Sequence, residues 1–269
     1  MLTRSGHDYE PLCQRWRELA QANGWACSVL AEAGGYPILQ IDHVPENGAR
    51  TSRSLHRDPS SIYLSAGVHG DECAPVWGLL FWVEQHAEWL SRRPFLLFPC
   101  LNPAGLVHNT RHDQDGTDLN RIFHDSSHPV IRSWQAAMAG RSFSQSICLH
   151  EDYDATGIYL YELSRQTSRG EGLIRSCEDL IPRERDGLVD GREFISAVRH
   201  AVEDEILMIV GEELQGGVPE AIYLFLNHAA TSFTFESPSE FDLARRIAVH
   251  RRFLDVVTNP GYLGDGSER

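Results

Sequence analysis

Apolar runs and helical patterns take turns along this chain, and polar stretches separate them. Residues 61–68 form a short β-branched and apolar run, which is typical of a buried strand. Residues 74–90 are largely apolar over a length typical of a helix, and 94–101 is again a short apolar run. Strands interleaved with helices predict a single three-layer α/β domain over residues 1–269.

The rest of the chain continues this alternation. We expect further helices over 9–23, 130–139, 164–180 and 240–257, and further strands over 25–32, 36–43, 144–150, 158–163, 206–210 and 231–236. Gly34 and Gly35 join the first two of these strands into a hairpin. Residues 45–59 and 102–127 are polar and predict loops, while 182–205 and 211–230 carry no clear pattern.

Charge narrows the class of partner. The chain carries a formal net charge of −14, from 38 acidic and 24 basic residues. Nucleic-acid binding requires a basic face that contacts phosphates, so we expect no nucleic-acid partner.

The cysteines and the lack of long apolar stretches predict a location. Six cysteines are scattered without a CxxC pair, and the first residues contain no apolar stretch of the kind found in signal peptides. No run of about 18 apolar residues occurs, so we expect no membrane partner. The sequence therefore predicts a cytoplasmic protein, and it leaves the oligomeric state open.

Polar side chains lie where several predicted strands end. His69 and Glu72 follow the strand at 61–68, and His150 and Glu236 end two further strands. Open α/β sheets bind their ligands at the carboxyl ends of the strands. Because a catalytic zinc ion takes three protein ligands and keeps a fourth position open, His69, Glu72 and His150 are a candidate ligand set.

Each candidate residue also has a structural alternative. An isolated His-x-x-Glu pair arises easily by chance among 13 histidines. The alternatives are a helix cap for His69 and Glu72, a hydrogen-bonded core histidine for His150, surface ion pairs for Arg111 and Arg121, and a structural carboxylate for Glu236.

Several short motifs follow one another between residues 61 and 238. They are HGDE at 69–72, NPAG at 102–105, NTR at 109–111 and DLNR at 118–121, followed by strands that end in His150 and Glu236. In this order they resemble the zinc carboxypeptidases of the carboxypeptidase A class. The clan of that class also contains the aspartoacylases and succinylglutamate desuccinylases. The resemblance implies an α/β/α sandwich with a mixed, mostly parallel sheet.

Position by position, the resemblance implies roles for eight matching residues and one further tyrosine. His69, Glu72 and His150 match the ligands of one zinc ion per chain, and Asp118 matches the carboxylate that holds the first zinc histidine. Glu236 matches the general base, and Arg111 matches the group that polarises the scissile carbonyl. Asn120 and Arg121 match the pair that binds the terminal carboxylate of the substrate. The peptidases also use a tyrosine upstream of the base, and Tyr223 stands in that region.

The chemistry of these residue types agrees with such roles. Zinc lowers the pKa of bound water towards neutrality, and a neighbouring carboxylate can take the proton and pass it to the leaving amine. An arginine binds a carboxylate through two parallel hydrogen bonds. A histidine on zinc usually donates its other N–H to a carboxylate or carbonyl.

Three functions compete at this point. The first is a zinc metallocarboxypeptidase or peptide amidase that cleaves an amide bond next to a free carboxylate of a small peptide. The second is an N-acyl amino acid deacylase of the aspartoacylase or succinylglutamate desuccinylase type, and the third is a catalytically inactive zinc-binding protein. The deacylase branch usually carries a β domain after the base, and few residues follow Glu236 here, so we expect the peptidase. We expect 211–230 to line its specificity pocket.

Overall fold

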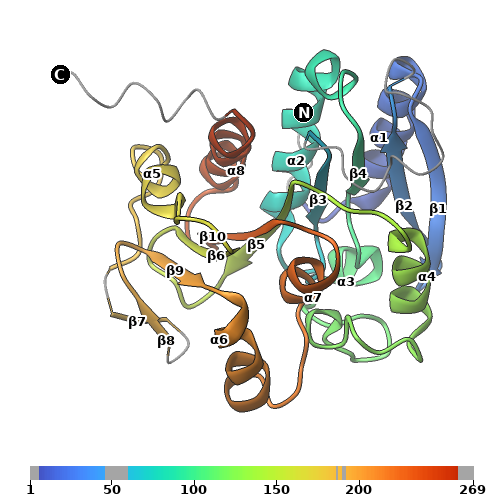
Figure 1. Ribbon diagram of the computed structural model, residues 1–269. Coiled ribbons are helices and arrows are strands. Elements are labelled where there is room, and N and C mark those ends of the chain that lie inside the picture. Colours follow the sequence, from blue (N-terminus) through green and yellow to red (C-terminus); the bar gives the residue numbers. More distant parts are fainter. Residues whose placement is uncertain (1–5, 46–59, 186, 190–191, 260–269) are drawn as a thin grey trace.

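The computed structural model describes residues 6–45, 60–185, 187–189 and 192–259. One large sheet runs through the fold (Figure 1). Its eight strands run in the order β1-β2-β4-β3-β5-β10-β6-β9. Their bounds are β1 (Ala26–Ala33), β2 (Tyr36–His43), β3 (Ile62–Ala66), β4 (Phe95–Phe98), β5 (Gln145–Asp152), β6 (Tyr159–Ser164), β9 (Val198–Ala201) and β10 (Thr231–Pro238). Two short strands, β7 (Gly187–Val189) and β8 (Arg192–Phe194), form a separate antiparallel pair.

The sheet is mixed, with a parallel centre. Strands β4, β3, β5 and β10 pair in parallel, and so do β6 and β9. Pairing is antiparallel between β1 and β2, between β2 and β4, and between β10 and β6. The expected α/β class with a mixed, mostly parallel sheet is confirmed, and the hairpin around Gly34 and Gly35 forms as predicted.

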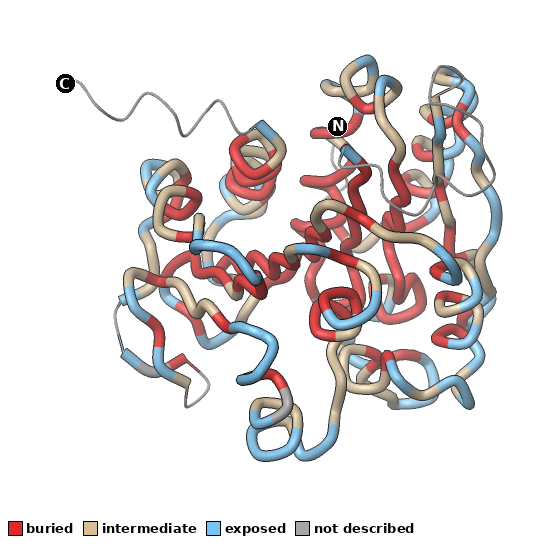
Figure 2. The backbone as a smooth tube through the Cα atoms, viewed as in Figure 1, coloured by how far each residue is buried: buried red, intermediate tan, exposed pale blue. Residues whose placement is uncertain are grey.

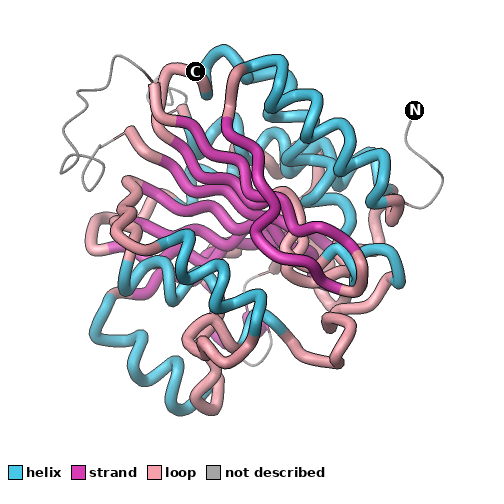
Figure 3. Tube along the Cα trace, turned by 90° about the vertical axis from the view of Figure 1, so that its right-hand side faces the viewer, coloured by secondary structure: helices cyan, strands magenta, loops and turns pink. Residues whose placement is uncertain are grey.

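Helices cover both faces of the sheet (Figure 3). They are α1 (Tyr9–Asn23), α2 (Cys73–Leu90), α3 (Pro103–His108), α4 (Pro129–Met138), α5 (Gly170–Arg175), α6 (Glu203–Met208), α7 (Glu220–Asn227) and α8 (Leu243–Thr258), with a 3₁₀ turn at Leu119–Arg121 and a π-helical turn at Ile209–Glu213. One core joins α1, α2 and α8 to the sheet through Trp16, Trp82 and Phe253. A second core, with Trp134 and Leu224, lies under α4 and α7. Strands β3, β5 and β10 between these cores are almost entirely buried (Figure 2).

The structure corrects three predicted elements. The expected strand at 206–210 is wrong, because α6 and the π-helical turn occupy these residues. Glu205 accepts a hydrogen bond from the Val202 N–H at 3.0 Å, and Ile206 is buried in one apolar cluster with Phe225. An acidic first turn with one buried apolar side is a helix pattern, and a run as short as 206–210 does not distinguish it from a strand.

The other two corrections concern loops. The expected helix at 164–180 is reduced to α5, since the Glu162 carboxylate accepts the N–H groups of Arg169 and Gly170 and keeps the preceding residues out of a helix. The polar stretch 102–127 contains α3 and the 3₁₀ turn. Most of the predicted loop 45–59 lies outside the described residues.

All six cysteines are free thiols. Within the described ranges, none of the helices combines the length and the apolar character that a membrane crossing requires. The cytoplasmic location and the single domain stay predictions.

We expect Gly78→Ala to destabilise the protein, although alanine is the better helix former. A Cβ atom at Gly78 would lie 2.8 Å from Cβ of His250, where α2 and α8 pack together. Overpacking of this kind typically costs about 1–3 kcal/mol, against a gain of roughly 0.5–1 kcal/mol in helix propensity. Urea unfolding measures the difference. Gly211→Ala is the control, because nothing lies within 4 Å of a Cβ there, and an equal effect of both variants would contradict the packing argument.

Candidate metal centre

The parallel centre of the sheet brings distant polar residues to one edge. Strands β3, β5 and β10 are neighbours, and their carboxyl ends lie together. Glu236 is paired in register with His150, and the chain passes from the end of β3 through Gly67 and Val68 to His69. The fold therefore gathers His69, His150 and Glu236 although they are far apart in the sequence.

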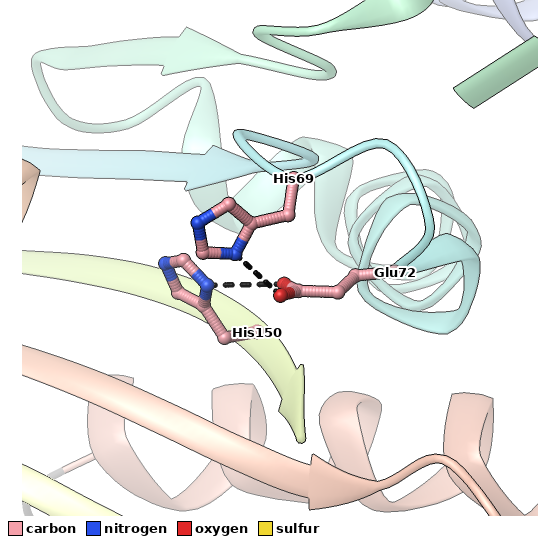
Figure 4. Close-up of side chains that lie close together, drawn as sticks. All are labelled: His69, Glu72 and His150. Atoms are coloured by element: carbon pink, nitrogen blue, oxygen red, sulfur yellow. Dashed lines mark hydrogen bonds and ion pairs between the residues drawn. The ribbon is translucent and has the colours of Figure 1, made fainter. Parts of the chain in front are cut away.

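Three buried side chains meet at this edge (Figure 4). The Nδ1 atom of His69 lies 2.5 Å from Oε1 of Glu72, and Nδ1 of His150 lies 3.0 Å from Oε2 of the same carboxylate. One candidate ligand atom from each residue lies within 4.8 Å of the others. The expected set of His69, Glu72 and His150 thus comes together around one point.

The turn that carries His69 and Glu72 is fixed by a close backbone contact. A Cβ atom at Gly70 would lie 2.0 Å from the carbonyl carbon of Gly105 in α3, so no larger residue fits there. Asn102 caps α3, because its Oδ1 accepts the Gly105 N–H at 2.9 Å. Its Nδ2 donates to the Arg111 carbonyl at 3.2 Å. The NPAG segment therefore supports the HGDE turn and the loop with Arg111.

Asp118 connects the cluster to Arg111. Its Oδ1 lies 3.2 Å from Nε2 of His69, the nitrogen that points away from Glu72. Its Oδ2 accepts a hydrogen bond from Nε of Arg111 at 3.1 Å. A carboxylate in this place fixes the ring of His69 and its tautomer, as is usual around metal-ligating histidines.

The electrostatics of the cluster favour a cation. Burial opposes the protonated form of His69, yet the Glu72 and Asp118 carboxylates raise its pKa to about 9. Glu72 also raises the pKa of His150 against the effect of burial. The Glu72 carboxylate thus favours positive charge on both histidines, and the same negative charge would favour a metal cation at this point.

The donor set also fits a metal ion. Oε2 of Glu72 is buried without a hydrogen-bond partner, although His150 lies at ion-pair distance. Two imidazoles and one carboxylate are a ligand set found at catalytic metal sites with an open position.

Glu236 stands beside the cluster with a strongly perturbed pKa. The residue is 9% exposed and lines the same cavity as His69 and Glu72. Burial is the largest effect, and with the nearby Glu72 and Asp152 carboxylates it raises the pKa of Glu236 to about 8. Burial thus makes this carboxylate a stronger proton acceptor than an exposed one, as a general base requires.

A cavity of about 500 Å³ opens over these residues, a size that accommodates a small ligand. Most of the residues expected at the site line it, namely His69, Glu72, Arg111, Asp118, Asn120, Arg121 and Glu236. Tyr223 is not one of the described residues that line this cavity. Its ring packs against Trp134 and His228 at centroid distances of 5.5 and 5.8 Å.

Comparison with known proteins adds the family context. Residues 58–146 match the family model of the succinylglutamate desuccinylase/aspartoacylase catalytic domain. Over 116 residues, 39% of the chain, the sequence is 33% identical to cytosolic carboxypeptidase 1 of Danio rerio, and the match spans 10% of that protein.

Solved structures of similar fold cover almost the whole chain. A candidate metallopeptidase of Shewanella amazonensis is 21% identical with a TM-score of 0.76, covering 93% of this chain and 92% of the other. Carboxypeptidase A of Helicoverpa armigera is 14% identical with a TM-score of 0.65, covering 97% and 75%. The chain has a carboxypeptidase-like fold. The resemblance to that class and its clan is confirmed.

The cavity has a wall that the sequence did not reveal. Tyr159 and Tyr161 line it from β6, and Arg192 and Arg199 line it from β8 and β9. Alternate tyrosines on one strand share a face, which was a usable signal, whereas the arginines lie in the unpatterned stretch 182–205. The expected contribution of 211–230 is present in part, through Leu214, Pro219, Ala221 and Ile222.

Proposed function

We propose that this protein is a zinc-dependent hydrolase that cleaves an amide bond next to a free carboxylate of a small peptide. The main support for this proposal is the combination of groups in one cavity. Two members of the buried His-Glu-His cluster, His69 and Glu72, line a cavity together with the carboxylate of raised pKa and with two arginines, Arg111 and Arg121. Each partial reaction of amide hydrolysis then has a suitable group within one cavity.

His69, Glu72 and His150 would hold the zinc ion, which supplies a Lewis acid and lowers the pKa of water when bound. Glu236 accepts the proton of the attacking water and passes it to the leaving amine. Glu236 lies buried in the wall of the same cavity.

Arg111 and Arg121 serve different parts of the substrate. Arg111 is held by Asp118 and stands 4.0 Å from Glu72, so it can stabilise negative charge on the carbonyl oxygen under attack. Arg121 lies in the DLNR turn beside Asn120. The Oδ1 atom of Asn120 accepts the Glu220 N–H at 2.9 Å, which leaves its amide nitrogen to donate to a substrate carboxylate.

A deacylase acting on N-acyl amino acids is the second candidate, and the match to the succinylglutamate desuccinylase/aspartoacylase model favours it. Both reactions use the same zinc ligands, base and arginines. They differ in the substrate. A carboxypeptidase releases the last amino acid of a peptide, whereas the deacylase removes a short acyl group from the nitrogen of an amino acid.

We expect the wild-type protein to hydrolyse peptides with a free C-terminus and to discriminate strongly against amidated ones. Loss of the carboxylate leaves Arg121 without its partner, which typically costs roughly 2–5 kcal/mol in kcat/KM. Arg121→Ala should raise KM for the free acid and remove most of this preference. A library of free-acid peptides, their amides and N-acyl amino acids measures both effects.

Arg132→Ala is the control, because Arg132 is exposed in α4 and does not line the cavity. Faster cleavage of acyl-aspartate or acyl-glutamate than of any peptide would support the deacylase instead. No turnover of either class by the zinc-loaded protein would leave an inactive zinc-binding protein.

A further inference from the structure

Glu151 follows the site residue His150, and Ser237 follows the site residue Glu236. Both side chains point to the face of the sheet opposite to the site. His150 and Glu236 are paired in register on β5 and β10, and so are Glu151 and Ser237. Successive side chains of a strand alternate between faces. Glu151 and Ser237 are buried on the side of α2 and α8, where their partners lie.

Glu151 is the centre of a buried polar network. Its Oε2 accepts the Ala74 N–H at 2.9 Å, and its Oε1 lies 2.6 Å from Nη1 of Arg246 in α8. The Ser237 hydroxyl lies 3.4 Å from the same Oε1 and 3.0 Å from Nε2 of His250. The network therefore joins β5, β10 and α8 to the first turn of α2.

The start of α2 explains why this contact matters. Glu72 occupies the N-cap position of α2, yet its side chain makes no capping hydrogen bond. An N-cap side chain normally accepts a free N–H of the first helical turn. Here the Glu72 carboxylate turns to His69 and His150 instead, and Glu151 accepts the N–H of Ala74, two residues further on.

We propose that Glu151, oriented by Arg246, is a positioning residue of the metal centre. It caps α2 from the neighbouring strand in place of Glu72, so that Glu72 is free to serve as a ligand. Because Glu151 directly follows His150, the same side chain fixes the distance between two ligand-bearing segments. This inference rests on the metal site of the proposed function, but not on the reaction.

The test measures zinc affinity by competition with a chromophoric chelator, together with the absorption spectrum of the cobalt-substituted protein. Glu151→Gln keeps an acceptor for Ala74 but leaves Arg246 unpaired. We expect a 10- to 100-fold loss of zinc affinity, as is typical when a group that orients a metal ligand is altered, and a changed cobalt spectrum. Arg246→Met should act in the same direction, and Arg246→Lys should recover part of the loss.

Arg252→Met is the matched control, since Arg252 also lies in α8 and pairs with Asp179 away from the site. Its zinc affinity should equal that of the wild type. If Glu151→Gln or Arg246→Met lowers only the melting temperature of the metal-free protein and leaves zinc affinity and the cobalt spectrum unchanged, the network is merely structural and the inference is wrong. Zinc binding by a wild-type protein without turnover would refute the proposed function alone.

Discussion

Glu236→Gln is expected to retain zinc and the fold while lowering kcat by roughly 10²- to 10⁴-fold. Glutamine fills the same space on β10 but cannot accept a proton. The loss should appear in kcat more than in KM, because the proton moves in the transition state. Zinc content, circular dichroism and steady-state kinetics on the best substrate provide the measurement.

Asp154→Asn is the control for Glu236→Gln. Asp154 also lines the cavity, but it is exposed and is not a member of the metal cluster. Removal of its charge should change kcat only slightly. A fall of less than tenfold for Glu236→Gln would assign the base to another residue.

His150→Ala is expected to abolish tight zinc binding, and His69→Ala should have the same effect. Each change removes one of three ligands and leaves Glu72 buried beside a single histidine. A ligand that binds only the native state stabilises it in proportion to the logarithm of its concentration over Kd. Zinc should therefore raise the melting temperature of the wild type and leave that of either variant nearly unchanged.

His108→Ala provides the matched control. His108 is the last residue of α3 and is not a member of the metal cluster, and its Nδ1 atom lies 2.8 Å from the Ala104 carbonyl in the same helix. This variant should bind zinc as the wild type does. Full zinc content in both His69→Ala and His150→Ala would refute the ligand assignment.

The sequence predicted those parts of the site that strand ends position. His69, His150 and Glu236 each follow an apolar run, so the pattern alone placed them at one edge of a sheet. The order of the motifs then added Arg111 and Arg121. His69, His150 and Glu236 converge because neighbouring parallel strands bring their carboxyl ends together.

Residues on irregular or edge segments were not predictable in the same way. Arg192 reaches the cavity from β8, a strand of three residues that pairs with β7, and no periodicity marks so short a strand. Tyr223 lies on α7 and packs against Trp134. Which side of that helix faces the core depends on tertiary packing, which the sequence alone does not reveal. Nothing in the sequence indicated the network around Glu151, since its partners Ala74 and Arg246 are remote in the chain.

The ligands of the cluster come from two places in the chain, and this links metal binding to folding. His69 and Glu72 are close in sequence, but His150 joins them only after β3 and β5 have paired. An unfolded chain therefore offers two of the three ligands and binds zinc weakly, because closing the intervening loop costs conformational entropy. Bound metal should slow global unfolding, and a chelator added to the native protein should speed it.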